Sequence, residues 1–196
     1  MSEREVVVPY VALLRGINVG GRRKVPMAAL RELLAARGFG AVRTHLQSGN
    51  AVFTAPPRGP AGLAAELSGA LGERFGFPVE CVVRSGEELR RGVARCPFPV
   101  AELDPARLLV VFLDGPATDH PVAALDPASF APDEFRLGER EVFAHFPGGM
   151  GRGRLGQRLA APAPGLVATG RNWRTVERLL ALVAEAPGGA GESVSR

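Results

Sequence analysis

The stretch VRTHLQSGNAVFT, residues 42–54, decides the fold, because it reads as two short strands joined by a tight connection. Val42–Leu46 and Ala51–Thr54 have the β-branched and aromatic residues that favour strands. Between them, Gly49 can supply the positive φ that a tight turn needs. We therefore expect two consecutive strands in the middle of the first half of the chain.

The segments on either side of this pair complete a repeating unit. An apolar run over residues 6–14 predicts a strand, and Pro26 suits the first position of a helix that ends at Gly38. After the pair, leucines at helical spacing predict a helix over 63–75, and residues 78–83 predict a fourth strand. The resulting order, βαββαβ, is typical of a ferredoxin-like sandwich.

The second half of the chain repeats this order in a weaker form. Its predicted elements are a linking helix at 87–93, a strand at 107–113, a proline-rich stretch at 116–132, a hairpin of 134–137 with 141–146, a helix at 155–159 and a strand at 166–169. The predicted fold class is α+β, with two ferredoxin-like (βαββαβ) halves, the second degenerate, plus a C-terminal helix. The expected divisions are a first half at 1–84, a linking helix and loop at 85–106, a second half at 107–170, a C-terminal helix at 171–186 and a disordered tail at 187–196.

Composition sets limits on function. The chain of 196 residues is 46% hydrophobic and 22% charged, as in ordinary soluble domains. It has no apolar run near the ~18 residues of a membrane span and no signal-peptide pattern, so we expect a cytoplasmic protein. Cys81 and Cys96 are expected to be reduced, buried thiols, and His45, His120 and His145 lack the spacing of metal ligands. We therefore expect no metal and no cofactor.

A basic, glycine-rich loop follows the first strand. RGINVGGRRK, residues 15–24, contains four cations, three glycines and no acid. In the predicted sheet the first two strands run parallel, so this loop should neighbour the turn at 47–50. The predicted ligand-binding residues are Arg15, Gly16, Asn18, Gly20, Gly21, Lys24, Gln47, Ser48 and Asn50, with Arg171 and Asn172 as a candidate third wall.

The residue types in these loops suit an anion. Glycines allow backbone N–H groups to turn inward, and the loop feeds the positive end of a helix. Arg15 offers a bidentate fork and Lys24 a mobile charge. The motif is neither a Walker A loop nor a dinucleotide fingerprint. The alternative stays open that the glycines only turn a corner and the cations are only solvated.

Two acid-free basic stretches, 6–31 and 142–176, suggest contributions to one positive surface. The net charge of +4 is weaker evidence, because one lysine against twenty-three arginines indicates the codon bias of a GC-rich genome. Within the second stretch, residues 148–154 form another basic glycine-rich loop before a helix and a candidate second anion cradle. Trp173 reads as a packing residue, with base stacking as the alternative.

Three motifs together resemble a bacterial family known as domain of unknown function 1697. They are LRGINVGG with KVPM (residues 14–21 and 24–27), QSGNAVF (47–53) and RNWRTV (171–176). The resemblance implies two ferredoxin-like halves and brings no established activity. Where the family shows serine-lysine-leucine, this chain has Gly153-Arg154-Leu155, which keeps the charge and loses a hydroxyl.

Three functional hypotheses follow. The first is a module that binds a phosphate-bearing partner, either a nucleotide or RNA, and needs no membrane. The second is a small phosphoryl- or acyl-transfer enzyme similar to acylphosphatases, with Arg15 holding the anion and Asn18 or Asn50 placing a water. Its weakness is that no carboxylate pair or base accompanies Ser48, so the catalytic residues are unknown. The third is a ligand-free oligomeric scaffold, for example a homodimer.

Overall fold

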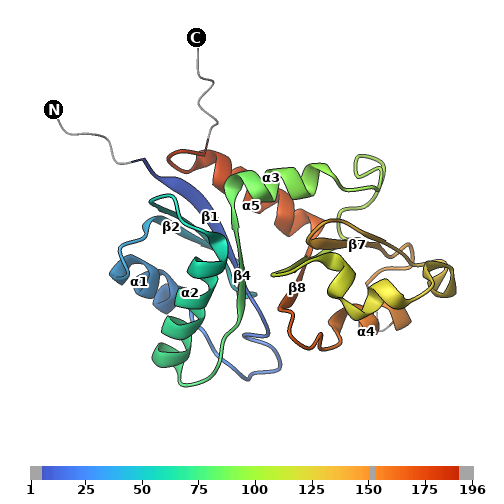
Figure 1. The fold of residues 1–196 in the computed structure, drawn as a ribbon, viewed down its shortest axis with the longest axis horizontal. Coiled ribbons are helices and arrows are strands. Elements are labelled where there is room, and N and C mark those ends of the chain that lie inside the picture. Colours follow the sequence, from blue (N-terminus) through green and yellow to red (C-terminus); the bar gives the residue numbers. More distant parts are fainter. Residues whose placement is uncertain (1–5, 151–152, 190–196) are drawn as a thin grey trace, which may run out of the picture. The chain divides into compact units, whose positions relative to one another are not determined.

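The chain forms two compact units, each built on its own four-stranded sheet. The structure is a computed structural model that describes residues 6–150 and 153–189. Of these, residues 6–89 and 179–189 form the first unit, and the remaining residues between 90 and 178 form the second. All strand pairs are antiparallel and helices accompany both sheets, so the fold class is α+β (Figure 1).

The first unit has the predicted order of elements. These are β1 (Val8–Leu14), α1 (Met27–Ala36), β2 (Gly40–His45), β3 (Asn50–Ala55), α2 (Pro60–Phe75) and β4 (Cys81–Ser85). The strands lie in the order β2-β3-β1-β4. Because β1 and β2 each pair antiparallel with β3, they run parallel to each other and end at the same edge of the sheet.

Alternation along the strands builds the first core. Tyr10, Ala12 and Leu14 of β1 lie on the face that packs against the two helices. The helices contribute apolar residues at helical spacing, namely Met27, Leu30 and Leu34 from α1 and Leu63, Leu67 and Leu71 from α2. The two helices therefore form one layer that covers one face of this sheet.

Prolines and glycines set the ends of the helices. Pro26 is the N-cap of α1 rather than its first residue, so the helix begins one residue later than predicted, at Met27. No side chain caps this end of the helix. Pro60 is the first residue of α2. Gly76, with φ of +76°, ends α2 and its N–H donates to the carbonyl of Gly72 at 2.9 Å.

The second unit repeats the strand pattern. Its strands are β5 (Leu108–Leu113), β6 (Glu134–Leu137), β7 (Glu141–His145) and β8 (Ala168–Asn172), in the order β6-β7-β5-β8. A helix, α4 (Arg154–Ala160), precedes β8. The other helix position holds three 3₁₀ turns, η1 (Ala117–Asp119), η2 (Pro121–Ala124) and η3 (Pro127–Phe130). A proline precedes or begins each turn and interrupts any continuous helix.

Two helices belong partly to each unit. These are α3 (Gly86–Ala94) and α5 (Trp173–Glu185). Asn172 caps α5, because its Oδ1 accepts from the N–H of Thr175 at 2.9 Å. Arg171 and Asn172, which the expected divisions grouped with the C-terminal helix, lie in β8, and the helix itself begins at Trp173. The buried face of α5 includes Val176, Leu179, Leu182 and Val183.

The structure also tests the expected burial of Trp173, Cys81 and Cys96. Trp173 is only 6% exposed, and its Nε1 donates to Glu177, which favours the packing interpretation. Cys81 is buried, and this burial raises the pKa of its thiol to about 11. Cys96 is half-buried, so the prediction that both thiols are buried is wrong for it.

Some expectations cannot be compared with the structure. Residues 151–152 of the second basic loop and residues 190–196 of the expected tail lie outside the described residues. In the described ranges, no helix combines the length and the apolar character needed to cross a membrane.

Candidate functional site

The loop between β1 and α1 is a small hairpin. The N–H of Arg22 donates to the carbonyl of Val19 at 3.1 Å, and the N–H of Asn18 donates to the carbonyl of Arg23 at 3.0 Å. Between them, Gly20 and Gly21 have φ of +58° and +73°. Two positive φ values within a hydrogen-bonded four-residue turn are the features of a type I′ turn, which selects glycine. These two glycines therefore turn the chain.

Asn18 joins this loop to the turn between β2 and β3. Its Oδ1 accepts from the N–H of Val25 at 2.9 Å, and its Nδ2 donates to the carbonyls of Val25 at 3.0 Å and Gln47 at 2.7 Å. The loop at 15–24 and the turn are thus in direct contact. An amide nitrogen carries two hydrogens, and both are used here.

Gly49 permits a close approach between the same two segments. The N–H of Leu14 donates to the carbonyl of Gly49 at 2.8 Å. A Cβ on Gly49 would lie 2.6 Å from Cδ1 of Ile17 and 2.8 Å from Cβ of Leu14, and the φ of Gly49 is +81°. A side chain at this position would separate the two segments or strain the turn.

Arg15 is engaged with an acid that the sequence pattern did not identify. Its guanidinium lies 2.9 Å from the carboxylate of Glu80, and its N–H donates to the carbonyl of Glu80 at 2.8 Å. The adjacent Gly16 has φ of +64°, and the position of its missing Cβ is 3.8 Å from the Arg23 guanidinium. Arg15 therefore anchors the end of β1 to the segment before β4.

Asn50 and Ser48 stabilise the turn, which spans residues 46–49 with Asn50 opening β3. Asn50 is fully buried, and its Nδ2 donates to the carbonyl of His45 at 2.7 Å and to Oγ of Ser48 at 3.0 Å. The Nδ2 hydrogens of Asn18 and Asn50 are both committed to the protein. The geometry thus gives no support to a role for either amide in placing a water.

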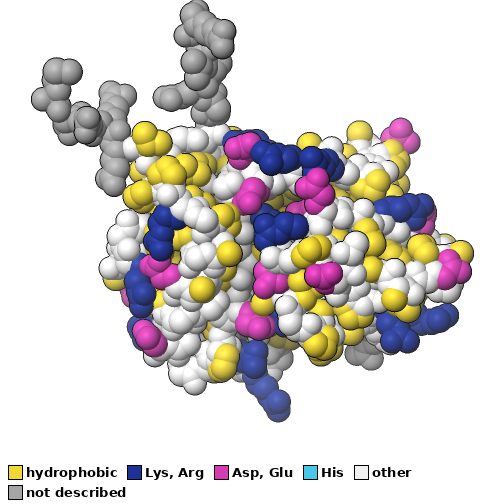
Figure 2. Space-filling view, in the orientation of Figure 1, with side chains coloured by type: hydrophobic (Ala, Val, Ile, Leu, Met, Phe, Trp, Pro, Cys, Tyr) yellow, Lys and Arg dark blue, Asp and Glu magenta, His cyan; other side chains and the backbone are white. Residues whose placement is uncertain are grey.

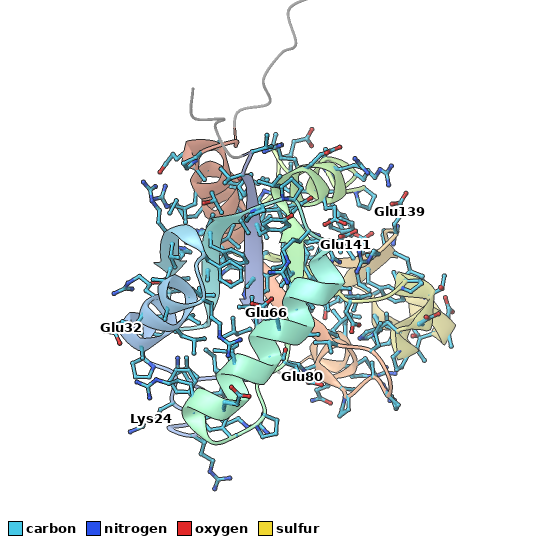
Figure 3. All side chains as sticks on the ribbon, turned by 60° about the vertical axis from the view of Figure 1, so that its left-hand side comes forward. Lys24, Glu32, Glu66, Glu80, Glu139 and Glu141 are labelled. Carbon is cyan, nitrogen blue, oxygen red and sulfur yellow. The ribbon has the colours of Figure 1, made fainter. Side chains whose placement is uncertain are left out.

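An open pocket lies where the loop, the turn and α1 meet. It has a volume of about 380 Å³ and is lined by Asn18, Gly21, Lys24, Val25, Pro26 and Gln47. Because no side chain caps α1, the N–H groups of its first turn are available to a ligand. Lys24 and Gln47 are exposed, and Figure 3 shows Lys24 extending outward. Ammonium, amide and backbone donors thus surround one space.

Three consecutive cations, Arg22, Arg23 and Lys24, are exposed beside this pocket. None has an ion-pair partner within the described part of the chain. Three other arginines in the first unit are paired with acids: Arg37 with Glu73 at 3.5 Å, Arg58 with Glu66 at 2.6 Å, and Arg43 with Glu185. In Figure 2 a Lys or Arg side chain protrudes from the lower rim, where Figure 1 draws the β1–α1 loop.

Arg171 and Asn172, the candidate third wall, belong to the second unit. Arg171 is 7% exposed, and its guanidinium donates to Oγ1 of Thr169 at 2.7 Å and to the carbonyl of Gly170 at 2.8 Å. Desolvation by burial lowers the pKa of Arg171 to about 10. Asn172 caps α5. Both side chains are thus engaged inside their own unit.

The second basic stretch is not acid-free in space. Oδ2 of Asp133 lies 3.2 Å from where Gly153, the N-cap of α4, would carry a Cβ. The guanidinium of Arg174 lies 3.5 Å from Asp104, and that of Arg154 stacks 5.7 Å from the ring centre of Phe130. A carboxylate therefore lies beside the start of α4 and opposes the binding of an anion there.

The pocket has the chemistry of binding rather than of proton transfer. Lys24 is the one titratable side chain among the described residues that line it. The described ranges also contain no cluster of three His, Cys, Asp or Glu residues that could hold a metal. A site with donors on several sides and no acceptor carboxylate is suited to an anion.

A known protein family matches a range of this chain that contains both the β1–α1 loop and the β2–β3 turn. Residues 7–143 match the family described as protein of unknown function (DUF1697). The chain belongs to this family. The matched range includes the hairpin loop, the β2–β3 turn and the start of α1 of this DUF1697 protein.

A solved structure has a similar fold. It is the conserved bacterial protein SP0830 from Streptococcus pneumoniae, which is 24% identical, with a TM-score of 0.73. The similarity covers 90% of this chain and 99% of that chain.

Among curated proteins there is no match. The cytoplasmic location and the homodimer stay predictions.

Proposed function

We propose that this DUF1697 protein binds a phosphate-bearing ligand in the pocket between the β1–α1 hairpin and the β2–β3 turn. The observation that carries the proposal is the cation trio Arg22–Lys24, which is exposed and has no carboxylate partner among the described residues, whereas Arg15 at the start of the same loop is paired with Glu80. Unopposed charge beside a pocket raises the local concentration of anions.

In this proposal the phosphate oxygens accept from Lys24, from the side-chain amide of Gln47 and from the first N–H groups of α1. The positive end of the helix dipole favours the same charge. Arg22 and Arg23 add attraction from the rim. Asn18 and Gly49 act indirectly, because they hold the hairpin and the turn together.

We also propose that each half is a ferredoxin-like unit. The support is the strand order β2-β3-β1-β4 and its repetition as β6-β7-β5-β8. In such a unit the end of β1 and the start of the following helix face one edge, which is where this pocket lies.

Calorimetry with a simple phosphate ester tests the proposed function. Lys24→Ala should weaken binding by about 1–3 kcal/mol, the usual range for losing a charge-assisted hydrogen bond. Arg37→Ala is the matched control, since it removes one exposed cation at the other end of α1. It should bind normally.

Salt distinguishes the two kinds of phosphate ligand. Binding of one small ester should weaken only slightly between 50 and 200 mM salt, whereas RNA contacting several phosphates would lose affinity steeply. Equal affinity of Lys24→Ala and the unaltered protein for the ester would refute the proposal. Thermal melts of both variants should match the unaltered protein, because exposed cations contribute little to stability.

A further inference from the structure

Two exposed aliphatic side chains flank the contact between the hairpin and the turn. Val19 is 69% exposed and Leu46 is 55% exposed, so both rank among the most exposed large hydrophobic residues described. Each is next in sequence to a residue of the pocket, Asn18 or Gln47, and these two residues are joined by a 2.7 Å hydrogen bond. Each aliphatic residue is therefore the immediate chain neighbour of a residue that lines the pocket.

The backbone presents Leu46 in a costly conformation. Its φ is +59°, a region that glycine and asparagine adopt readily and leucine rarely does. With 55% of its surface exposed, Leu46 gains only part of the burial that could offset this strain. Strained residues of this kind gather where a ligand is held.

The pocket itself lacks the groups that recognise a nucleobase. Its apolar lining comes from Val25 and Pro26, and none of the described residues that line it is aromatic. Bases are held by aromatic stacking or by paired hydrogen bonds to their edges. The side-chain amides that line the pocket are those of Asn18 and Gln47, and both Nδ2 hydrogens of Asn18 are already used within the protein. The volume of about 380 Å³ is within the usual range for small-molecule sites.

We infer that the ligand of this pocket is a phosphate ester with an aliphatic body rather than a nucleotide or RNA. This inference rests on the proposed function. The phosphate lies against Lys24, Gln47 and the start of α1. The aliphatic body lies over Val25 and Pro26 and against Val19 and Leu46. A soluble alkyl phosphate and the headgroup region of a phosphatidic acid present the same chemistry.

The test compares three monoesters by calorimetry: methyl phosphate, hexyl phosphate and AMP. Burial of one methylene group strengthens binding by about fourfold. Hexyl phosphate should therefore bind at least about tenfold more tightly than methyl phosphate, even if its chain is only partly buried. AMP should bind no more tightly than methyl phosphate.

Variants at the rim assign the gain to the two aliphatic side chains. Leu46→Asn suits the positive φ and so should fold normally, and Val19→Thr keeps the shape of the side chain. Both should lose most of the hexyl advantage and keep their affinity for methyl phosphate. Val6→Thr is the control, because Val6 is as exposed as Val19, at 69%, and is not next in sequence to any residue that lines the pocket.

The outcomes separate the two claims. If hexyl phosphate binds no better than methyl phosphate, or AMP binds best, the inference is wrong and the anion site remains. If Lys24→Ala binds methyl phosphate normally, the proposed function itself fails. Sedimentation with phosphatidylcholine vesicles containing phosphatidic acid then identifies the source. Vesicle binding that Leu46→Asn abolishes indicates a lipid, and hexyl phosphate binding without vesicle binding indicates a soluble ester. Either result upholds the inference.

Discussion

Asn18 shows how a residue type that suits ligand binding can have a structural role instead. Its side chain makes three hydrogen bonds, to both backbone groups of Val25 and to the carbonyl of Gln47. Its φ of +56° is in the left-handed region, which asparagine tolerates better than most residues. Asn18 thus fixes the hairpin to the turn and defines one side of the pocket.

Asn18→Ala should therefore lower the free energy of unfolding by about 1–3 kcal/mol, because buried backbone groups lose their partners and alanine disfavours this φ. Asn18→Gly removes the same hydrogen bonds while relieving the backbone, so it should fall between Asn18→Ala and the unaltered protein. Urea denaturation measures both. If Asn18→Ala is as stable as the unaltered protein, these bonds do not hold the loops together.

The sequence predicted the neighbourhood of this site but not all of its contacts. Strand order alone placed the loop beside the turn, because the order follows from alternating apolar patterns. It could not identify Glu80 as the partner of Arg15, since the two are 65 residues apart and meet only when β4 pairs with β1. The glycines were ambiguous for a similar reason. Whether Gly20 and Gly21 cradle a phosphate or make a turn depends on the hydrogen bonds across the hairpin.

At the scale of elements, one of the three 3₁₀ turns of the second unit is capped by a buried histidine. His120 is 1% exposed, and its Nδ1 accepts from the N–H of Val122 at 3.1 Å, which caps η2. The sequence could predict that prolines prevent a long helix here, but not that a histidine would cap one of the turns. Desolvation lowers the pKa of His120 below its ordinary 6.5.

This shift predicts a loss of stability in mild acid. Below about pH 6.5 the unfolded chain takes up a proton on His120, whereas burial keeps the folded unit unprotonated. The free energy of unfolding therefore decreases as the pH is lowered, until the pH reaches the lowered pKa of the folded state. Above that range it should not depend on this group. His120→Asn keeps an acceptor for Val122 without a titratable ring, so its melting temperature should change less between pH 7.5 and 5. Equal pH dependence in both proteins would mean that His120 is not the source.

At the scale of the whole molecule, the same strand order occurs twice, and the run of three consecutive exposed cations without a carboxylate partner among the described residues lies in the first unit. In the first unit the cations Arg22–Lys24 are exposed and have no carboxylate partner among the described residues. In the second unit Asp133 and Asp104 approach the basic stretch from distant parts of the sequence. An acid-free run in a sequence thus predicts little about charge in space, because folding brings acids from elsewhere. We expect anion binding to be a property of the first unit.

The most direct test of this account is a titration with methyl phosphate followed by the backbone amide resonances of the uniformly labelled protein. The account predicts saturable shifts at residues 18–29, which include the hairpin and the first turn of α1, and at residues 46–48 of the neighbouring turn. Lys24→Ala should weaken all of these shifts together, and Arg37→Ala should leave them unchanged. Shifts concentrated instead at residues 153–158, where Asp133 meets the start of α4, or no saturable shift at all, would contradict it.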